Sequence, residues 1–254
     1  MGRTRVSGHS KWSSIKHKKG ALDAKRGQLF TKLGREITVA ARQGGGADPT
    51  MNAGLRIAIQ RAKDANMPNA NVDRAVQRAV GVGDAEQLVE VMYEGYGPGG
   101  TAVLVEAVTD NRNRTVADVR VAFSRGGGNL AEAGAVAWQF DLRGLVTVRA
   151  AGVDPDEVQL AAIEAGALDV SVEDDEVEIV SEPADLEAVR EGLTEAGFDV
   201  ERSELARVPQ SMVELDEKAA TQTLHLLERL DELDDVSRVY SNADFPTEVL
   251  EAAS

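Results

Sequence analysis

The spacing of apolar residues changes once along this 254-residue chain, near residue 80, and the change limits the folds open to it. Before that point, apolar side chains recur every three or four residues, which is the period of an α-helix. From Leu88 onward they alternate or run together in short stretches, which is typical of β-strands. The sequence therefore predicts a helical domain followed by domains built on sheets.

Three amphipathic helices are predicted before the change. The first begins near Ala21 and ends at three consecutive glycines, the second follows Asn52, and the third follows Asn71. Short amphipathic helices can bury their apolar faces only against one another. Residues 1–80 are therefore predicted to form a small all-helical domain.

The later segments predict two α/β units. Residues 141–208 contain a weak internal repeat of two β-α-β units, which favours a ferredoxin-like sandwich with one sheet and two helices. A last helix and strand, near residues 216–241, cannot close a core alone. We expect them to return to the segment before the repeat, and we expect the chain to be frayed from Pro246 onward.

The predicted fold class is α+β with three domains, in which a helical domain precedes two α/β sandwich domains. Residues 1–80 form the helical domain, and residues 85–140 plus 209–245 form a discontinuous α/β domain. The ferredoxin-like domain, residues 141–208, is inserted in the discontinuous one.

The net charge of −15 hides a sharp separation of signs. Residues 1–80 contain 16 Lys+Arg and 5 Asp+Glu, a net of +11, whereas residues 81–254 contain 12 and 38, a net of −26. This separation predicts that the first domain binds a polyanion, while the acidic remainder gives solubility and repels nonspecific nucleic acid. The acidic domains either bind a protein partner or fold back on the basic end.

The positive charge is densest in residues 8–32, where seven Lys+Arg face one acid. Trp12 and His17 lie among the charges and add a stacking surface and hydrogen-bond donors, so phosphate plus base is the natural target. A basic run alone is about as often only a solvated tail. The predicted nucleic-acid-binding residues are Lys11, Trp12, Lys16, His17, Lys18, Lys19, Lys25, Arg26, Lys32, Arg35 and Arg42.

Four of these residues belong to the first predicted helix, where they project away from its apolar face: Lys25, Lys32, Arg35 and Arg42. Arg26 instead falls among the apolar positions. It either pairs inside the fold with an acid such as Asp23 or reaches outward, and the sequence favours neither reading.

Further arginines are predicted to make secondary phosphate contacts. Arg74 and Arg78 lie one turn apart on the third helix. Arg112 and Arg114 lie at the start of a helix predicted over residues 115–124, where free N–H groups can bind phosphate. Capping of this helix by a nearby Asn or Thr is the favoured interpretation of its polar start. The glycine-rich loops at 95–100 and 126–128 are predicted to be tight turns, because no Lys followed by Ser or Thr closes either into a P-loop.

Several functional classes lack support in the sequence. Without cysteine there is no disulfide, thiol catalysis or cysteine-ligated zinc, and no run of eighteen apolar residues predicts a membrane span. The absence of a secretory signal leads us to expect a cytoplasmic protein. The three histidines form no nucleophile–base or zinc pattern, so we predict no catalytic residue, metal or cofactor. A Mg²⁺-dependent enzyme acting on nucleic acid is the minority hypothesis.

Four motifs in this order resemble the YebC/PmpR family of probable transcriptional regulatory proteins: GHSKWSSIKHKKGALDAKRGQLFTK, MPNANVDRAV, YEGYGPGGTAVLVEAVTDNRNRT and GGGNLAEAGAVAWQF. The resemblance extends from about Ser7 to Phe245. It implies three domains, a cytoplasmic location and no enzyme activity.

The resemblance implies two functions. Bacterial members are described as DNA-binding regulators. The similar mitochondrial translational activator of cytochrome c oxidase, and some bacterial relatives, act at the ribosome, on proline-rich stretches. The two hypotheses are therefore a DNA-binding transcriptional regulator and a ribosome-associated, rRNA-binding translation factor. The basic segment suits duplex DNA and structured RNA about equally.

Overall fold

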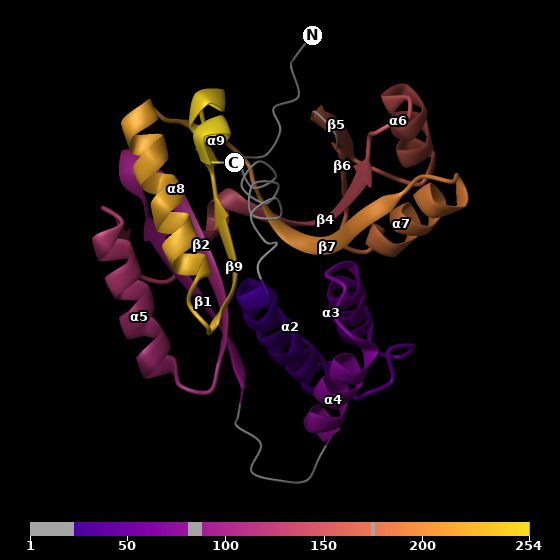
Figure 1. Ribbon diagram of the computed structural model, residues 1–254, viewed down its shortest axis with the longest axis horizontal. Helices are drawn as coiled ribbons and strands as arrows, with labels where there is room; N and C mark the ends of the chain where they lie inside the picture. The colour runs from indigo at the N-terminus through magenta and orange to yellow at the C-terminus, as the bar shows by residue number, and fades with distance from the viewer. Residues whose placement is uncertain (1–22, 81–87, 174–175, 254) are drawn as a thin grey trace.

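A computed structural model describes residues 23–80, 88–173 and 176–253 of the chain. It combines helices and sheets in three parts: a helical part at the bottom of the view, one sheet-containing part above it and another beside it (Figure 1). The predicted α+β class, with a ferredoxin-like unit inserted in the preceding one, is confirmed. The exact domain boundaries stay a prediction. None of the helices described is both long and apolar enough to cross a membrane.

The helical part consists of α2 (Asp23–Gln43), α3 (Ala53–Asp64) and α4 (Asn69–Val80). The side chain of Asn52 caps α3 by accepting a hydrogen bond from the Leu55 N–H, as the sequence pattern suggests. Helix α4 starts three residues earlier than predicted, because the Pro68 carbonyl already accepts from Asn71 and Val72. The predicted apolar faces form one core that includes Leu33, Ile37, Leu55, Ala62 and Val72.

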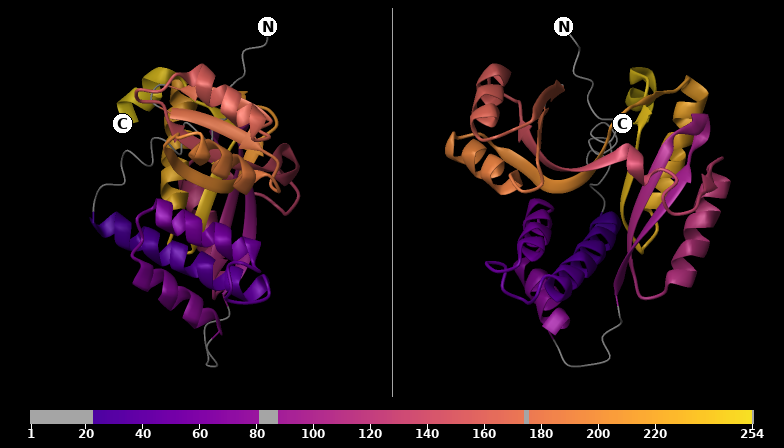
Figure 2. Two further views of the ribbon diagram at one scale, coloured as in Figure 1. Left: turned by 90° about the vertical axis from the view of Figure 1, so that its right-hand side faces the viewer. Right: turned by 180° about the vertical axis from the view of Figure 1, so that it is seen from behind.

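The first sheet has the order β3-β1-β2-β9 and is antiparallel throughout. Helices α5 and α8 lie side by side over one of its faces (Figures 1 and 2). The turn between β1 and β2 contains Gly99 and Gly100, both with positive φ, which confirms a tight hairpin turn. The elements are β1 (Val89–Tyr96), β2 (Ala102–Thr109), α5 (Arg112–Arg125), β3 (Asn129–Leu130), α8 (Glu217–Asp231) and β9 (Val236–Ser241).

The second sheet has the order β5-β6-β4-β7, and its chain order is β-α-β-β-α-β. This is the ferredoxin-like arrangement that the internal repeat predicts. Its strands lie between β3 and β9 in the chain, so the first sheet is assembled from segments on both sides of it. The elements are β4 (Phe140–Arg149), α6 (Pro155–Glu164), β5 (Asp169–Glu173), β6 (Glu176–Ser181), α7 (Leu186–Glu195) and β7 (Val200–Pro209).

The end of the chain is ordered, so the prediction that it frays from Pro246 is wrong. A short parallel pair, β8 (Val213–Glu214) and β10 (Ala243–Asp244), leads to helix α9 (Thr247–Ala253). The Pro246 carbonyl accepts from the Val249 and Leu250 N–H groups and so starts this helix. Val249 is only 6% exposed because it packs into the core beneath α8.

A cluster of charged side chains lies where the three parts meet. Helix α2 packs on β2 and β9, and α3 packs on β7. Arg61 on α3 donates to Glu36 on α2 at 2.7 Å and lies 3.2 Å from the carboxylate of Glu204 on β7. Arg238 on β9 lies 3.6 Å from Glu36. Two arginines and two glutamates from four elements thus join the helical part to both sheets.

Candidate nucleic-acid interface

Much of the predicted binding segment lies outside the described residues. These positions are Lys11, Trp12, Lys16, His17, Lys18 and Lys19. Lys25 lies in the first turn of α2, and its side chain is also outside what the structure describes. The remaining predicted contacts fall on α2, α4 and α5, and the structure separates them into two groups.

The first group is used to hold the fold together. Lys32 is 7% exposed and its Nζ donates to the Asp231 carbonyl, so the prediction that it projects away from the packed face of α2 is wrong. Arg35 donates to an Asp235 carboxylate oxygen at 2.8 Å and to the Asp234 carbonyl at 3.1 Å. One polar side of α2 is therefore docked on the turn between α8 and β9.

Arg114 belongs to the same group. Its Nη2 lies 2.7 Å from Asp235 and 2.8 Å from Asp110. Thr115 adds a hydrogen bond of 2.8 Å to Asp235. Burial raises the pKa of the Asp235 carboxyl, but the hydrogen bonds from Arg114 and Thr115 outweigh this effect and leave the pKa below its ordinary value. Lys32, Arg35 and Arg114 thus meet at one acidic turn.

The start of α5 shows the capping that the sequence favours. The side chain of Asn111 accepts from the Arg114 N–H at 3.1 Å, which satisfies a free donor of the first turn. Arg112 remains exposed beside this cap.

The second group faces solvent. Arg26 is exposed, with its guanidinium 5.8 Å from the centre of the Phe30 ring, so the outward reading holds for this residue. Arg74 and Arg78 are both exposed on α4, where Arg74 donates to Asn71 at 3.2 Å. Arg42 is half-buried near the end of α2.

Helix α4 offers the most open face of the helical part. Whereas α2 and α3 each pack on a sheet, α4 packs mainly on α2. Its exposed positions carry polar or charged groups suited to phosphate and base edges: Asn69, Asp73, Arg74, Gln77 and Arg78. Arg74 and Arg78 on this face, with Arg26, Arg42 and Arg112, are the described predicted contacts outside the first group.

Trp138 is a surface feature that the sequence analysis did not assign to the site. It is 68% exposed, and its indole N–H donates to the Ala135 carbonyl at 3.1 Å. The loop that carries it is fixed by the buried carboxylate of Glu94, which accepts from the N–H groups of Gly134, Val136 and Ala137 at 2.6 to 2.7 Å. Burial raises the pKa of Glu94, but these three donors outweigh it and lower that pKa. The sequence signal that could have identified Trp138 is its position as an aromatic residue in a loop that contains glycine.

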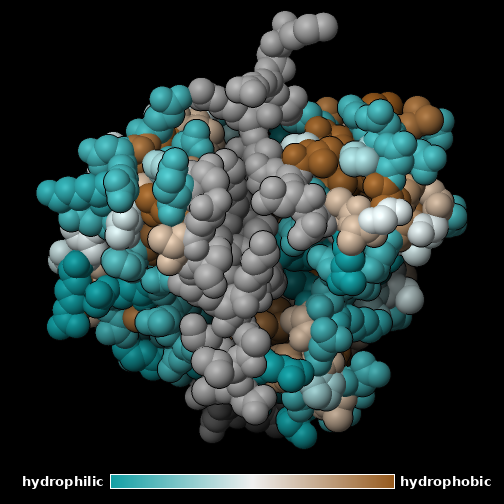
Figure 3. All heavy atoms as spheres, turned by 45° about the horizontal axis from the view of Figure 1, so that its top comes forward, coloured by the Kyte–Doolittle hydropathy of each residue, from teal (hydrophilic) through white to brown (hydrophobic). Residues whose placement is uncertain are grey.

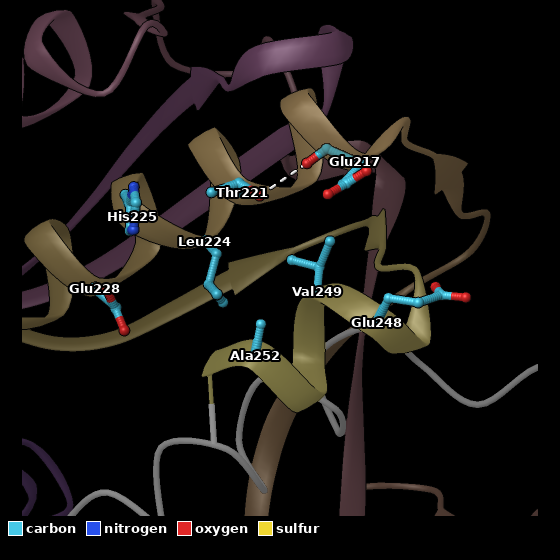
Figure 4. Close-up of a pocket in the computed structure, with 8 residues that line it drawn as sticks. All are labelled: Glu217, Thr221, Leu224, His225, Glu228, Glu248, Val249 and Ala252. Atoms are coloured by element: carbon cyan, nitrogen blue, oxygen red, sulfur yellow. Dashed lines mark hydrogen bonds between the residues drawn. The ribbon is translucent and has the colours of Figure 1, made fainter.

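Two other surfaces do not suit phosphate. A cavity of about 240 Å³ lies between α8 and α9 (Figure 4), lined by Glu217, Thr221, Leu224, His225, Glu228, Glu248, Val249 and Ala252. Its glutamates give it negative charge.

Apolar residues also gather on the side that holds α6 and β5 (Figure 3), where Leu160, Ile163, Leu168 and Val172 are exposed. Among the described residues, no three or more His, Asp or Glu side chains are placed to hold a metal ion.

Comparisons with known proteins cover nearly the whole chain. The TACO1/YebC protein N-terminal domain matches residues 10–82, and the TACO1/YebC second and third domain matches residues 88–243. A probable transcriptional regulatory protein of Dehalococcoides mccartyi is 53% identical over 97% of this chain and 98% of its own. Another of that name, from Rubrobacter xylanophilus, is 52% identical over 96% and 98%.

A solved structure agrees with these matches. The crystal structure of a conserved hypothetical protein from Aquifex aeolicus has a TM-score of 0.86 and 45% identity, over 94% of this chain and 98% of its own. Similarity in sequence and in fold thus extends over all three parts. This chain belongs to the TACO1/YebC family.

Proposed function

We propose that this protein is a non-enzymatic, nucleic-acid-binding regulator of gene expression, and that it acts as a DNA-binding transcriptional regulator in the cytoplasm. The separation of charge carries this proposal, because residues 1–80 have a net charge of +11 in a chain whose remainder has −26. A polyanion is the partner that such a domain selects. The relatives named probable transcriptional regulatory proteins support the same function.

The binding surface in this proposal is the basic segment together with the open face of the helical part. Lys11, Lys16, Lys18, Lys19 and Lys25 supply phosphate contacts, and Trp12 and His17 add stacking. Arg26 and Arg42, with Arg74 and Arg78 on α4, extend the surface. Lys32, Arg35 and Arg114 serve it indirectly, because their contacts hold α2 and α5 against the α8–β9 turn. The acidic sheets remain available to a protein partner.

A second candidate is an rRNA-binding translation factor at the ribosome. Trp138 favours this candidate, because a fixed and exposed indole can stack on an unpaired base. Duplex DNA keeps its bases stacked in the helix and offers no such contact. A Mg²⁺-dependent nucleic-acid enzyme is not part of the proposal.

Replacing Lys16, Lys18 and Lys19 with alanine tests the binding surface. The variant should bind a fluorescein-labelled 30-base-pair duplex at least about tenfold more weakly, since each lysine releases counterions from phosphate. Its thermal stability should remain close to that of the wild type. The control removes three arginines that are already ion-paired in the ferredoxin-like unit, with Arg143→Ala, Arg149→Ala and Arg190→Ala. Equal weakening by both sets, or unfolding of the lysine variant, would contradict the proposal.

The nucleic acid itself is identified in cells. The native protein is crosslinked, the lysate is sedimented at low salt before and after ribonuclease, and the bound nucleic acid is sequenced. Slow sedimentation with crosslinks in promoter DNA is the result expected of a transcriptional regulator. Ribonuclease-sensitive movement with ribosomal subunits, with crosslinks in rRNA, would establish the translation factor instead.

A further inference from the structure

Helix α5 carries arginines that form no ion pair among the described residues, although it belongs to an acid-rich part of the chain. Residues 81–254 contain 12 Lys+Arg beside 38 Asp+Glu, so an arginine there has many carboxylates to pair with. Seven of the twelve do form ion pairs, namely Arg114, Arg143, Arg149, Arg190, Arg202, Arg207 and Arg238. Within the described residues, Arg112, Arg120 and Arg125 form none, and all three are exposed on α5.

The surface of α5 around these arginines carries little competing charge, since its one acid is exposed Asp118. The 14 residues of this helix contain four arginines against this one acid. The exposed ridge between Arg120 and Arg125 consists of small or uncharged residues, including Ala117, Ser124 and Val121, which is 47% exposed. By contrast, α8 beside it mixes the signs, because it carries two glutamates and an aspartate along with Lys218 and Arg229. The positive face therefore belongs to α5.

Arg114 compensates the negative charge at the start of this face. The guanidinium of Arg114 binds two carboxylates near the first turn of α5, those of Asp110 and Asp235. Arg112 can therefore act on an outside anion, because its neighbouring carboxylates are already compensated. This assigns different roles to two adjacent arginines that look equivalent in the sequence.

We propose that the exposed face of α5, with Arg112, Arg120 and Arg125, is a second phosphate-binding surface for nucleic acid. The inference rests on the proposed function and adds a contact surface outside the helical part. Guanidinium groups bind phosphate oxygens in a bidentate manner. The helix spans about 20 Å between its terminal arginines, a length over which a nucleic-acid backbone presents several phosphates. Its buried residues Val119, Ala122 and Phe123 fix the helix on the first sheet, so the backbone that carries the arginines is held in place.

The test compares three variants of the full chain with the wild type. One carries Arg112→Ala, Arg120→Ala and Arg125→Ala, and one replaces the same residues with lysine. The control carries Arg143→Ala, Arg149→Ala and Arg190→Ala, which change the net charge by the same amount elsewhere. Binding of a fluorescein-labelled 30-base-pair duplex and of a structured RNA hairpin is measured from 50 to 200 mM KCl, and folding is checked by circular dichroism.

The alanine variant should lose about tenfold in affinity for at least one probe, and its slope of log K against log salt should be shallower by about 2.5. The lysine variant should keep the slope, and the control should keep both slope and affinity. Wild-type affinity in the folded alanine variant would overturn the α5 surface and leave α5 to an acidic protein partner. If the alanine variant is unfolded, single alanine variants decide instead, each with a slope that should be shallower by about 0.9. If the wild type binds neither probe, the proposed function is overturned as well. If only the Lys16, Lys18 and Lys19 variant loses affinity, the α5 surface alone is overturned.

Discussion

Asp235 is a buried carboxylate on which three elements converge. It accepts hydrogen bonds from Arg35 on α2 and from Arg114 and Thr115 on α5, and it directly precedes β9. Burial alone would favour the neutral acid, but these donors keep its pKa below the ordinary value. Arg35 and Arg114, which the sequence predicts to contact phosphate, therefore bind Asp235 and hold α2 and α5 together.

Replacing Asp235 with alanine should destabilise the protein by about 2 kcal/mol, because half-buried Arg35 loses its counter-charge and the buried hydroxyl of Thr115 loses an acceptor. The matched control is Asp234→Ala, since exposed Asp234 accepts only from Gln28 through its side chain in the described contacts, and it should cost less than about 0.5 kcal/mol. Urea unfolding at neutral pH measures both. Equal costs would show that Asp235 does not hold these elements together.

The same residue predicts a pH dependence. A carboxyl whose folded-state pKa is depressed contributes stability that is complete above its unfolded-state pKa, about 4, and is lost as pH falls through the folded-state value. The stability difference between the wild type and Asp235→Asn should therefore shrink as pH falls below about 4. A difference that is constant down to pH 2 would contradict the assignment of a depressed pKa.

Glu94 should control the position of Trp138. In Glu94→Gln, one amide oxygen replaces a carboxylate that accepts three N–H donors, so at least one donor loses its partner at a cost of about 2 kcal/mol. In a Trp12→Phe background, tryptophan fluorescence reports on Trp138 alone, because the chain has two tryptophans. The variant should shift and broaden this emission, while Glu132→Gln, an exposed change in the same loop, should not. An unchanged spectrum would separate the loop from Glu94.

At the scale of elements, α2 and α3 are held to the sheets by charge as well as by apolar contact. Burial raises the pKa of Glu36, yet Arg61 and Arg238 outweigh this and lower it, so Glu36 is ionised where the three parts meet. Glu36→Gln should cost about 3 kcal/mol, because two buried guanidinium groups then lack one carboxylate. Hydrogen exchange should show faster opening of α3, and Asp73→Asn on exposed α4 serves as the control. Unchanged exchange in α3 would contradict this role.

Helix α9 gives a test of order at the end of the chain. Val249→Ala should cost about 2 kcal/mol because it removes buried methyl groups from the core beneath α8. Exposed Glu248 on the same helix provides the control, and Glu248→Ala should be nearly neutral. Thermal unfolding measures both, and equal melting temperatures would indicate a frayed end after all.

The elements could be read from the sequence because their signals are local. Apolar spacing located α2, α3, α4 and the strands of both sheets other than β3, and the repeat located the ferredoxin-like unit. Helix α9 was missed because seven residues after a proline give too few turns for a periodic pattern. The roles of Lys32, Arg35 and Arg114 were missed because their partners lie about 120 to 200 residues away along the chain. Exposed arginines such as Arg74 needed no distant partner, so the pattern placed them on the surface without difficulty.

At the scale of the whole molecule, the charges of the helical part are divided between docking and solvent. Two of its acids face the sheets, where Glu36 binds Arg238 and Asp64 accepts from the Ser203 N–H. Arg56 and Arg61 bind Glu187 and Glu204 of the ferredoxin-like unit. Outside these contacts, four exposed bases remain among the described side chains, namely Arg26, Lys63, Arg74 and Arg78, beside two exposed acids, Asp48 and Asp73. The exposed charge of the described helical part is therefore positive on balance, as a polyanion-binding domain requires.

The salt dependence of binding tests the central claim most directly. The affinity of the wild type for a fluorescein-labelled 30-base-pair duplex is measured by anisotropy between 50 and 200 mM KCl. If the basic surface neutralises about six phosphates, log K falls against log salt with a slope near −5, and somewhat less on single-stranded RNA. A flat response on both nucleic acids would contradict the account, because the excess charge of the helical part would then serve some partner other than a polyanion.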